Sequence, residues 1–163
     1  MPTRQSGFTY LFVLMLVAFL GLGLAAAGQV WHTEAQRARE ADLLFIGNQY
    51  RRAIQSYYEF DKNAPRLPQH IEDLLEDNRQ PEVRHLRRAW RDPFTGDAFE
   101  LIPAPGGTGF IGVASRSTAT PFKKAGFDPR DSAFADAATY AEWHFVFVPP
   151  VLPAQSTSQN SAQ

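Results

Sequence analysis

The sequence predicts an α+β protein in which one long N-terminal helix carries a small antiparallel β-sheet. Three observations predict it. Residues 5–33 contain no Asp, Glu, Lys or Arg, although charged residues make up 20% of the 163-residue chain. Residues 33–60 repeat apolar side chains at helical spacing. The second half of the chain contains short runs rich in β-branched and aromatic residues, bounded by Gly and Pro.

The first expected element is an apolar helix over residues 8–31. At about 1.5 Å per residue it would be roughly 36 Å long, which exceeds the roughly 30 Å hydrocarbon core of a bilayer. Tyr10 and Trp31 lie near its two ends, where aromatic side chains favour the membrane interfaces. We therefore expect it to span a membrane. A cleaved secretory signal peptide, with residues 25–27 as its small-residue site, is the alternative.

The same helix is expected to continue to about residue 60. An apolar stripe runs along it at spacings of three and four residues, and the turn formers and proline of residues 61–65 end it. Such a stripe is typical of a helix face that packs on the sheet of its own domain. Its members are Leu43, Ile46, Tyr50, Ala53, Ile54 and Tyr57.

The remainder is expected to form a small head. Short helices are predicted over residues 68–76 and 81–90, followed by a turn at residues 92–96. In the last predicted strand Trp143, Phe145 and Phe147 alternate with other residues, which indicates one buried sheet face. A tail without apolar periodicity, over residues 149–163, is expected to be disordered. The predicted strands are residues 98–102, 109–115 and 142–148.

No catalytic set, cofactor site or metal site is expected. The chain has no cysteine, and its histidines lack the paired spacing of a zinc site. Gly107, Gly109 and Gly112 match a dinucleotide-binding pattern, but a strand rather than a helix is predicted there, so we expect a hairpin. The histidines are His32, His70, His85 and His144.

Two charged clusters have a functional and a plainer interpretation. Asp128, Asp131 and Asp136 could hold calcium, but their spacing fits no known loop signature and a solvated loop is the default. An arginine cluster could hold DNA, but the acidic residues nearby and the net charge of −1 favour a solvated helix face, so no nucleic acid is expected. The arginines are Arg84, Arg87, Arg88 and Arg91.

The leader region, residues 4–11, resembles the prepilin leader of type IV pilins and type II secretion pseudopilins. The layout from Tyr57–Tyr58 to Asp92–Pro93 is similar to that of G-type pseudopilins. The resemblance implies a pilin-like fold, peptidase cleavage between Gly7 and Phe8, and N-methylation of Phe8. It also implies a single-pass inner-membrane protein with its head in the periplasm, an orientation that the arginines on both sides of the apolar run leave open.

On that basis residues 1–7 are the leader, 8–31 the membrane and filament-core helix, and 32–148 the head. The family's usual glutamate at the fifth mature position is replaced by Phe12, which the resemblance associates with a minor subunit. The implied function is structural rather than enzymatic. The implied partners are other pilin-like subunits, the prepilin peptidase, and the assembly platform protein with its ATPase. The alternative is a signal-anchored periplasmic adaptor that does not polymerise.

Overall fold

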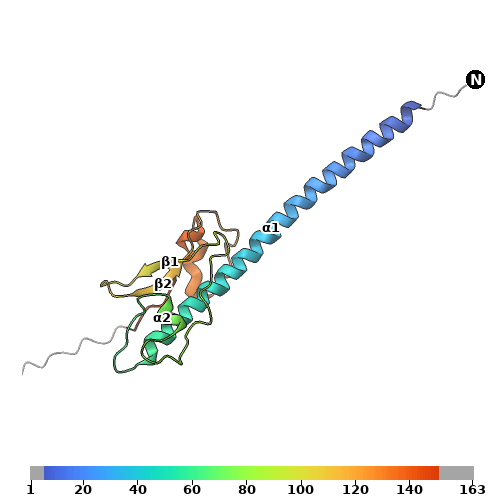
Figure 1. The fold of residues 1–163 in the computed structure, drawn as a ribbon. Helices are drawn as coiled ribbons and strands as arrows, with labels where there is room; N and C mark the ends of the chain where they lie inside the picture. The colour runs from blue at the N-terminus through green and yellow to red at the C-terminus, as the bar shows by residue number, and fades with distance from the viewer. Residues whose placement is uncertain (1–5, 151–163) are drawn as a thin grey trace, which may run out of the picture.

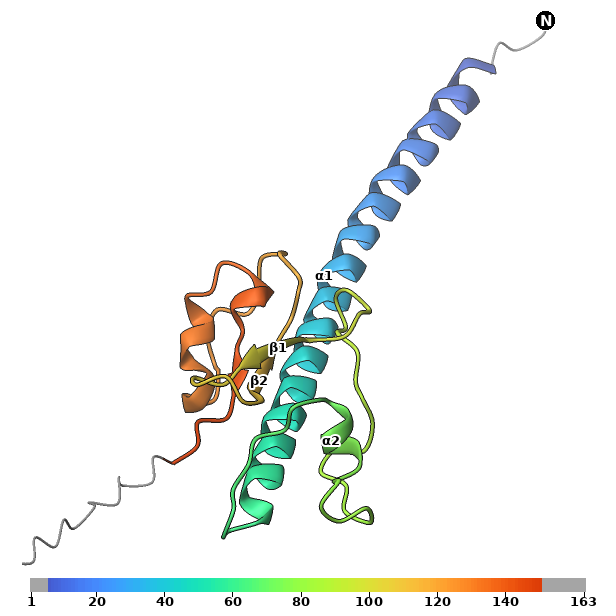
Figure 2. The same ribbon diagram turned by 60° about the vertical axis from the view of Figure 1, so that its left-hand side comes forward.

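The computed structural model describes residues 6–150 of the chain. Residues 1–5 and 151–163 lie outside the described part. For residues 6–8, 22–30 and 32 the backbone is described but the side chains are not. The fold is α+β, as predicted: one long helix, a three-stranded antiparallel sheet and short helices. The sheet and the short helices gather on the second half of the long helix, and the first half projects from them (Figures 1 and 2).

The long helix, α1, runs from Ser6 to Phe60. It ends at the residue that the sequence predicts. The carboxylate of Asp61 accepts hydrogen bonds from the backbone N–H groups of Asn63 (3.0 Å) and Ala64 (3.2 Å), and these bonds turn the chain away from the helix axis. The predicted apolar stripe is confirmed: all six of its side chains are buried, Leu43, Tyr50 and Ile54 completely.

The sheet has the order β1-β2-β3, with β1 at Glu100–Pro103, β2 at Phe110–Ala114 and β3 at Phe145–Val146. Both strand pairs are antiparallel. The strands β2 and β3 pack on α1. The alternation predicted for the last strand is confirmed, since Trp143, Phe145 and Phe147 are buried. The strand itself is shorter than predicted, because a 3-10 helix, η2 (Tyr140–Glu142), occupies its first residue and the two before it.

A glycine lets α1 approach the sheet closely. A Cβ atom built on Gly47 would overlap the ring of Phe145 in β3. Interiors are close-packed, so this contact fixes how deeply the helix sits against the strand. The glycine-rich segment joins β1 to β2, with Gly106, Gly107 and Gly109 at positive φ. The hairpin interpretation of this segment is therefore confirmed.

The first predicted short helix is present but brief: α2 comprises only Glu72–Leu75. The chain before it is hydrogen-bonded elsewhere. The carbonyl of Pro68 accepts from Phe110 N–H (2.9 Å), and the Asp73 carboxylate accepts from the backbone N–H groups of Gln69 (2.8 Å) and His70 (2.9 Å). The first of these bonds ties the segment to the sheet, and the other two hold it against α2.

The prediction of a second short helix over residues 81–90 is wrong, because this segment forms no helix in the structure. Its backbone N–H groups bind α2 instead of each other: those of His85 (3.0 Å) and Leu86 (2.8 Å) both donate to the carbonyl of Leu74. The side chain of Leu86 enters the core. Tertiary hydrogen bonds and burial thus override a local helical pattern.

The segment after β2 crosses back over α1 and contains a 3-10 helix, η1 (Pro129–Ala135). In Figure 2 this segment, coloured orange, lies on one side of α1, and α2 lies on another. Aromatic rings fill the space between the segment and β3, with Phe134 stacked on Trp143 at 5.3 Å between ring centroids. The core therefore combines the stripe of α1, the sheet and this crossing segment.

Candidate functional site

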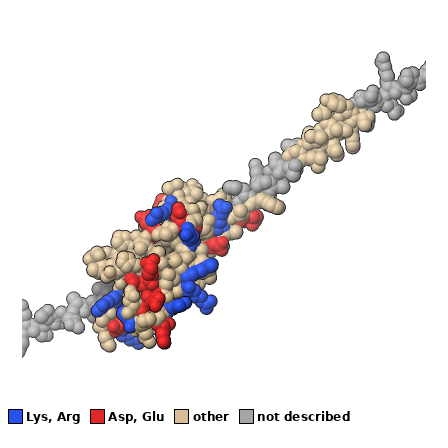
Figure 3. Space-filling view, viewed as in Figure 1, with Lys and Arg blue, Asp and Glu red and all other residues tan. Residues whose placement is uncertain are grey.

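The projecting half of α1 carries apolar side chains that its own chain leaves uncovered. Every residue from 9 to 21 is exposed, and none is charged. The large side chains are exposed by half or more of their area, Tyr10 by 70% and Phe12 by 60%. Figure 3 shows the contrast: charges of both signs cover the head, whereas the tan, outer part of the projecting rod shows none. A continuous apolar surface of this kind marks a site of contact with lipid or protein.

The predicted membrane span coincides with this rod. Among the residues that the structure describes, no helix carries a stretch both long and apolar enough to cross a membrane. The predicted span, residues 8–31, includes Phe8 and residues 22–30, whose side chains lie outside the described set.

The structure places the predicted processing residues at the start of α1. Gly7 and Phe8 follow Ser6, the first residue of the helix, and their side chains lie outside the described residues. Cleavage after Gly7 and methylation of Phe8 therefore stay predictions. Phe12 lies about one turn further along, on the exposed apolar rod.

Where the rod enters the head, a buried glutamate holds the segment that crosses it. The Glu40 side chain accepts hydrogen bonds from the backbone N–H groups of Phe122 (2.6 Å) and Lys123 (3.1 Å) and from the hydroxyl of Tyr140 (2.7 Å). Gln36, one turn earlier, donates to the same hydroxyl (3.1 Å). Burial, together with the neighbouring Glu40, raises the pKa of Tyr140 to about 12, so this hydroxyl stays a donor at ordinary pH.

A second attachment lies three turns further along α1. The guanidinium of Arg51 donates to the carboxylate of Asp131 in η1 at 2.6 Å, and both side chains are more than nine-tenths buried. The solvated-loop interpretation is therefore wrong for Asp131. Asp128 is exposed and caps η1 by accepting from the N–H of Arg130, and Asp136 is also exposed. Within the described residues these carboxylates do not meet as a metal site.

Sequence reasoning missed the roles of Glu40 and Arg51, although their spacing carried a signal. The face of the apolar stripe that includes Ile54 continues toward the N-terminus through Arg51, Gly47 and Glu40. These positions are separated by three, four and seven residues, which are helical spacings. A charged residue on such a face predicts a buried partner. Nothing in the sequence identified Asp131 or the N–H groups of residues 122 and 123 as those partners.

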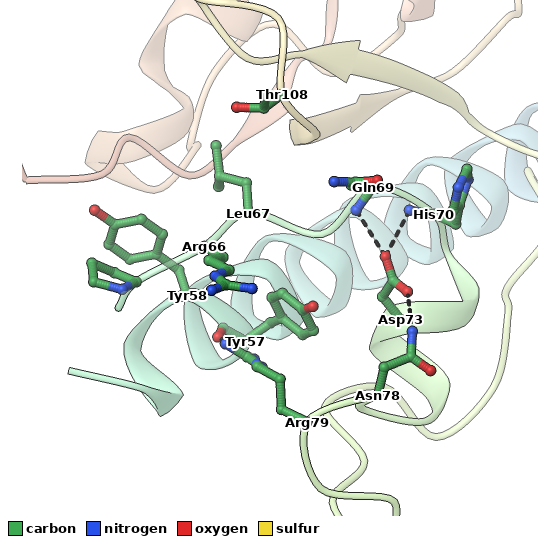
Figure 4. Close-up of a pocket in the computed structure, with 11 residues that line it drawn as sticks. Tyr57, Tyr58, Arg66, Leu67, Gln69, His70, Asp73, Asn78, Arg79 and Thr108 are labelled. Carbon is green, nitrogen blue, oxygen red and sulfur yellow. Dashed lines mark hydrogen bonds between the residues drawn. The ribbon is translucent and has the colours of Figure 1, made fainter. Parts of the chain in front are cut away.

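A hollow on the head lies at the other end of α1. It measures about 580 Å³ and is lined by residues of the α1 end, the chain before α2, α2 with the loop after it, and the hairpin (Figure 4). Its carboxylate, Asp73, is directed at backbone N–H groups and the amide of Asn78 (3.0 Å). One of its two guanidinium groups, that of Arg79, lies 4.0 Å from the ring centre of Tyr57. Both groups are held by the head itself, which is a structural role.

Beside this hollow, Asp77 gathers donors around one fully buried carboxylate. Arg79 donates to it at 2.7 Å, and a ring nitrogen of His85 lies 3.2 Å away. The hydrogen bonds from Arg79, opposed by burial, lower the pKa of Asp77 to about 2. The other ring nitrogen of His85 meets the hydroxyl of Ser56 at 2.8 Å. This network joins α1 to the loop after α2.

The other residues considered for chemistry have structural partners or are exposed. Ser115, buried after β2, donates to Asp92 at 2.6 Å, and Asp92 in turn accepts from the N–H of Phe94 to close the predicted turn. The arginines of residues 84–91 are all exposed. Comparison with protein-family models, curated proteins and solved structures found no match to this chain.

Proposed function

We propose that this chain is a structural, non-catalytic pilin-like subunit, of the minor pseudopilin type, in a filament of the type II secretion or type IV pilus kind. The observation that carries the proposal is the rod: residues 9–21 are uncharged, apolar and exposed, on the same helix that forms the core of the head. The leader-like sequence that precedes the rod supports processing after Gly7. In this proposal the fold is pilin-like: the first half of α1 is the membrane anchor, and the head is built on its second half.

The rod requires two successive environments. Before assembly it would lie in the inner membrane as a single pass, with the head in the periplasm, because an α-helix satisfies its own backbone hydrogen bonds in lipid. During assembly it would leave the lipid and pack against the rods of other subunits. Lipid tails and apolar side chains are similar solvents, so this exchange loses little hydrophobic free energy.

The chain supplies neither the processing nor the force for this exchange. The prepilin peptidase would remove residues 1–7, and a platform protein with an ATPase would extract the rod. Phe12 suits a subunit of special position, because it replaces the carboxylate that would pair with the amine of a neighbouring subunit. An apolar residue there also enters lipid more readily than an unpaired carboxylate.

Phe12 also favours a second candidate, a signal-anchored periplasmic adaptor that does not polymerise. In that function the rod would stay in the membrane permanently and the leader would remain attached. The head would then bind its partners as a tethered domain.

The intact mass of the protein purified from its own cells separates the two. The pilin-like function predicts loss of residues 1–7 and gain of one methyl group on Phe8. A Gly7→Val variant is the matched control and should keep the full precursor mass, because the bulky side chain blocks the peptidase. An unprocessed wild-type protein, or a Gly7→Val variant that is cut normally, would contradict the proposal.

A further inference from the structure

A groove on the head, separate from the rod, has the chemistry of a protein-binding surface. It lies between α1 and the loop that replaces the second predicted helix, and measures about 550 Å³. None of the residues that line it is acidic. They include Phe45 and Gln49 of α1 and Arg84, Leu86, Arg87 and Trp90 of the loop.

The arginines at this groove lack carboxylate partners. Elsewhere on the head Arg51, Arg79 and Arg130 each pair with an aspartate. By contrast, none of the exposed arginines of residues 84–91 forms an ion pair with an acidic residue in the described part of the chain. This holds even for Glu82, which lies nearby in the sequence. Their positive charges are therefore left for solvent or a partner.

The loop holds these arginines on a fixed backbone. Leu86 is buried and its N–H donates to Leu74 at 2.8 Å. The hydroxyl of Tyr50, in the core, donates to the carbonyl of Trp90 at 3.0 Å. Because the loop is anchored at both points, a ligand that binds the arginines would not have to order the loop first, which favours affinity.

Aromatic side chains give the groove an apolar part beside its charges. Phe45 is 53% exposed and meets Trp90 edge to face, with ring centroids 6.1 Å apart. The guanidinium of Arg88 lies 3.7 Å from the centre of the Trp90 ring. Aromatic residues and arginine are the side chains that most often dominate the binding energy of protein interfaces.

We propose that this groove binds an acidic segment of a partner protein, one that carries Asp or Glu side chains together with an apolar residue. The unpaired arginines would receive the carboxylates, and Phe45 with Trp90 would receive the apolar side chain. Single-stranded nucleic acid fits less well. It needs free aromatic faces on which bases can stack, whereas Arg88 covers one face of Trp90.

The test uses the full-length protein in detergent micelles and does not depend on leader processing or assembly. Fluorescence anisotropy would follow a labelled peptide of alternating glutamate and leucine, a lysine–leucine peptide of equal length, and oligothymidine of matched charge. We expect saturable binding of the acidic peptide that weakens as salt is added. The double variant R84E/R87E should weaken it about tenfold or more, because it replaces attraction by repulsion.

Two matched variants separate charge from folding. R84K/R87K keeps both charges and should bind within about threefold of wild type if charge is what the peptide recognises. R66E reverses an exposed arginine outside the groove and should bind as wild type does. All variants should melt at the wild-type temperature, because the altered side chains are exposed.

Three results would each overturn the proposal: R84E/R87E binding the acidic peptide as tightly as wild type; equal affinity for the lysine–leucine peptide; or tighter binding of oligothymidine that R84E/R87E abolishes. The last result would identify a nucleic-acid surface instead. Failure of this test would leave the intact-mass test of the pilin-like function unaffected, since the two use different parts of the chain.

Discussion

Buried charged side chains hold this head to its helix. Glu40 and Arg51 stand on the buried face of α1, and each binds a different part of the segment that follows β2. Burying a charge is unfavourable unless a partner satisfies it, so such residues are sensitive to the loss of that partner. Their contacts connect positions about 80 to 100 residues apart in sequence, which makes them specific to this fold.

Removing one partner of the Arg51–Asp131 pair should destabilise the head strongly. We expect Asp131→Ala to lower the free energy of unfolding by about 3–5 kcal/mol, because it leaves a buried guanidinium unpaired. Urea unfolding of the full-length protein in micelles, followed by near-ultraviolet circular dichroism, measures this loss.

The matched control is Asp128→Ala in the same 3-10 helix region. Asp128 pairs with Arg130 at 3.2 Å, but both are exposed. Solvent screens such a pair, and the cap that Asp128 gives η1 contributes only modestly, so this variant should lose much less stability than Asp131→Ala. Equal losses for the two variants would mean that burial of Asp131 does not determine its contribution.

Asp77 should make part of the stability depend on pH at the acid end. Its folded pKa of about 2 lies below the ordinary value of 3.8. A lowered folded pKa stabilises the head above the unfolded value, and this stabilisation disappears as pH falls through the folded value. The contribution should be about 2 kcal/mol above pH 5 and vanish toward pH 2.

Comparison with Asp77→Asn isolates this effect from other acids. The difference in unfolding free energy between wild type and variant should be largest above pH 5 and shrink as pH falls from 4 to 2. A difference that stays constant over this range would show that Asp77 titrates alike in folded and unfolded chains.

At the scale of elements, α1 has two halves with different surfaces. The second half buries an apolar stripe against β2 and β3, and the first half leaves its apolar residues exposed. At Gly47 the helix presents no side chain to Phe145, so helix and sheet approach each other closely there. The position of the rod relative to the head is therefore determined by packing along one helix face.

Adding a side chain at Gly47 should push α1 and β3 apart. We expect Gly47→Ala to destabilise the head by about 1–3 kcal/mol, since the added methyl group would overlap the Phe145 ring. Gly21→Ala is the control, because a Cβ there meets nothing within 4 Å. Urea unfolding compares the two variants.

A second variant tests the mechanism. If the overlap with Phe145 is the cause, Phe145→Leu should lessen the effect of Gly47→Ala, so that the double variant loses less than the sum of the single losses. Simple additivity would place the effect of Gly47→Ala elsewhere, for example in a change confined to α1.

The sequence predicted elements with a strong period better than those without one. The stripe of α1, its end near residue 60 and the alternation of residues 142–148 depend on regular spacing, which local sequence carries. The prediction of a helix over residues 81–90 is wrong, because hydrogen bonds to the carbonyl of Leu74 hold that loop. These bonds are tertiary contacts, which local sequence does not reveal. For the same reason Arg51 could be suspected from its spacing, but its partner Asp131 could not be identified.

At the scale of the whole molecule, an apolar rod projects from a charged head (Figures 1 and 3). The head satisfies its buried charges internally, whereas the rod leaves large apolar side chains in contact with solvent. Burying such surface is favourable at roughly 25 cal/mol per Å². The exposed surface of residues 9–21 therefore favours contact with lipid or with other helices, as the proposed function requires.

Site-specific photo-crosslinking in living cells can show whether the rod packs against the rods of other subunits, as the proposed function requires. A benzoylphenylalanine placed at Leu16, which is 50% exposed, would react with whatever covers the rod. We expect covalent adducts with the apolar helix of another pilin-like subunit, formed only when the assembly ATPase is active. Adducts with lipid alone, unchanged by the ATPase, would contradict it.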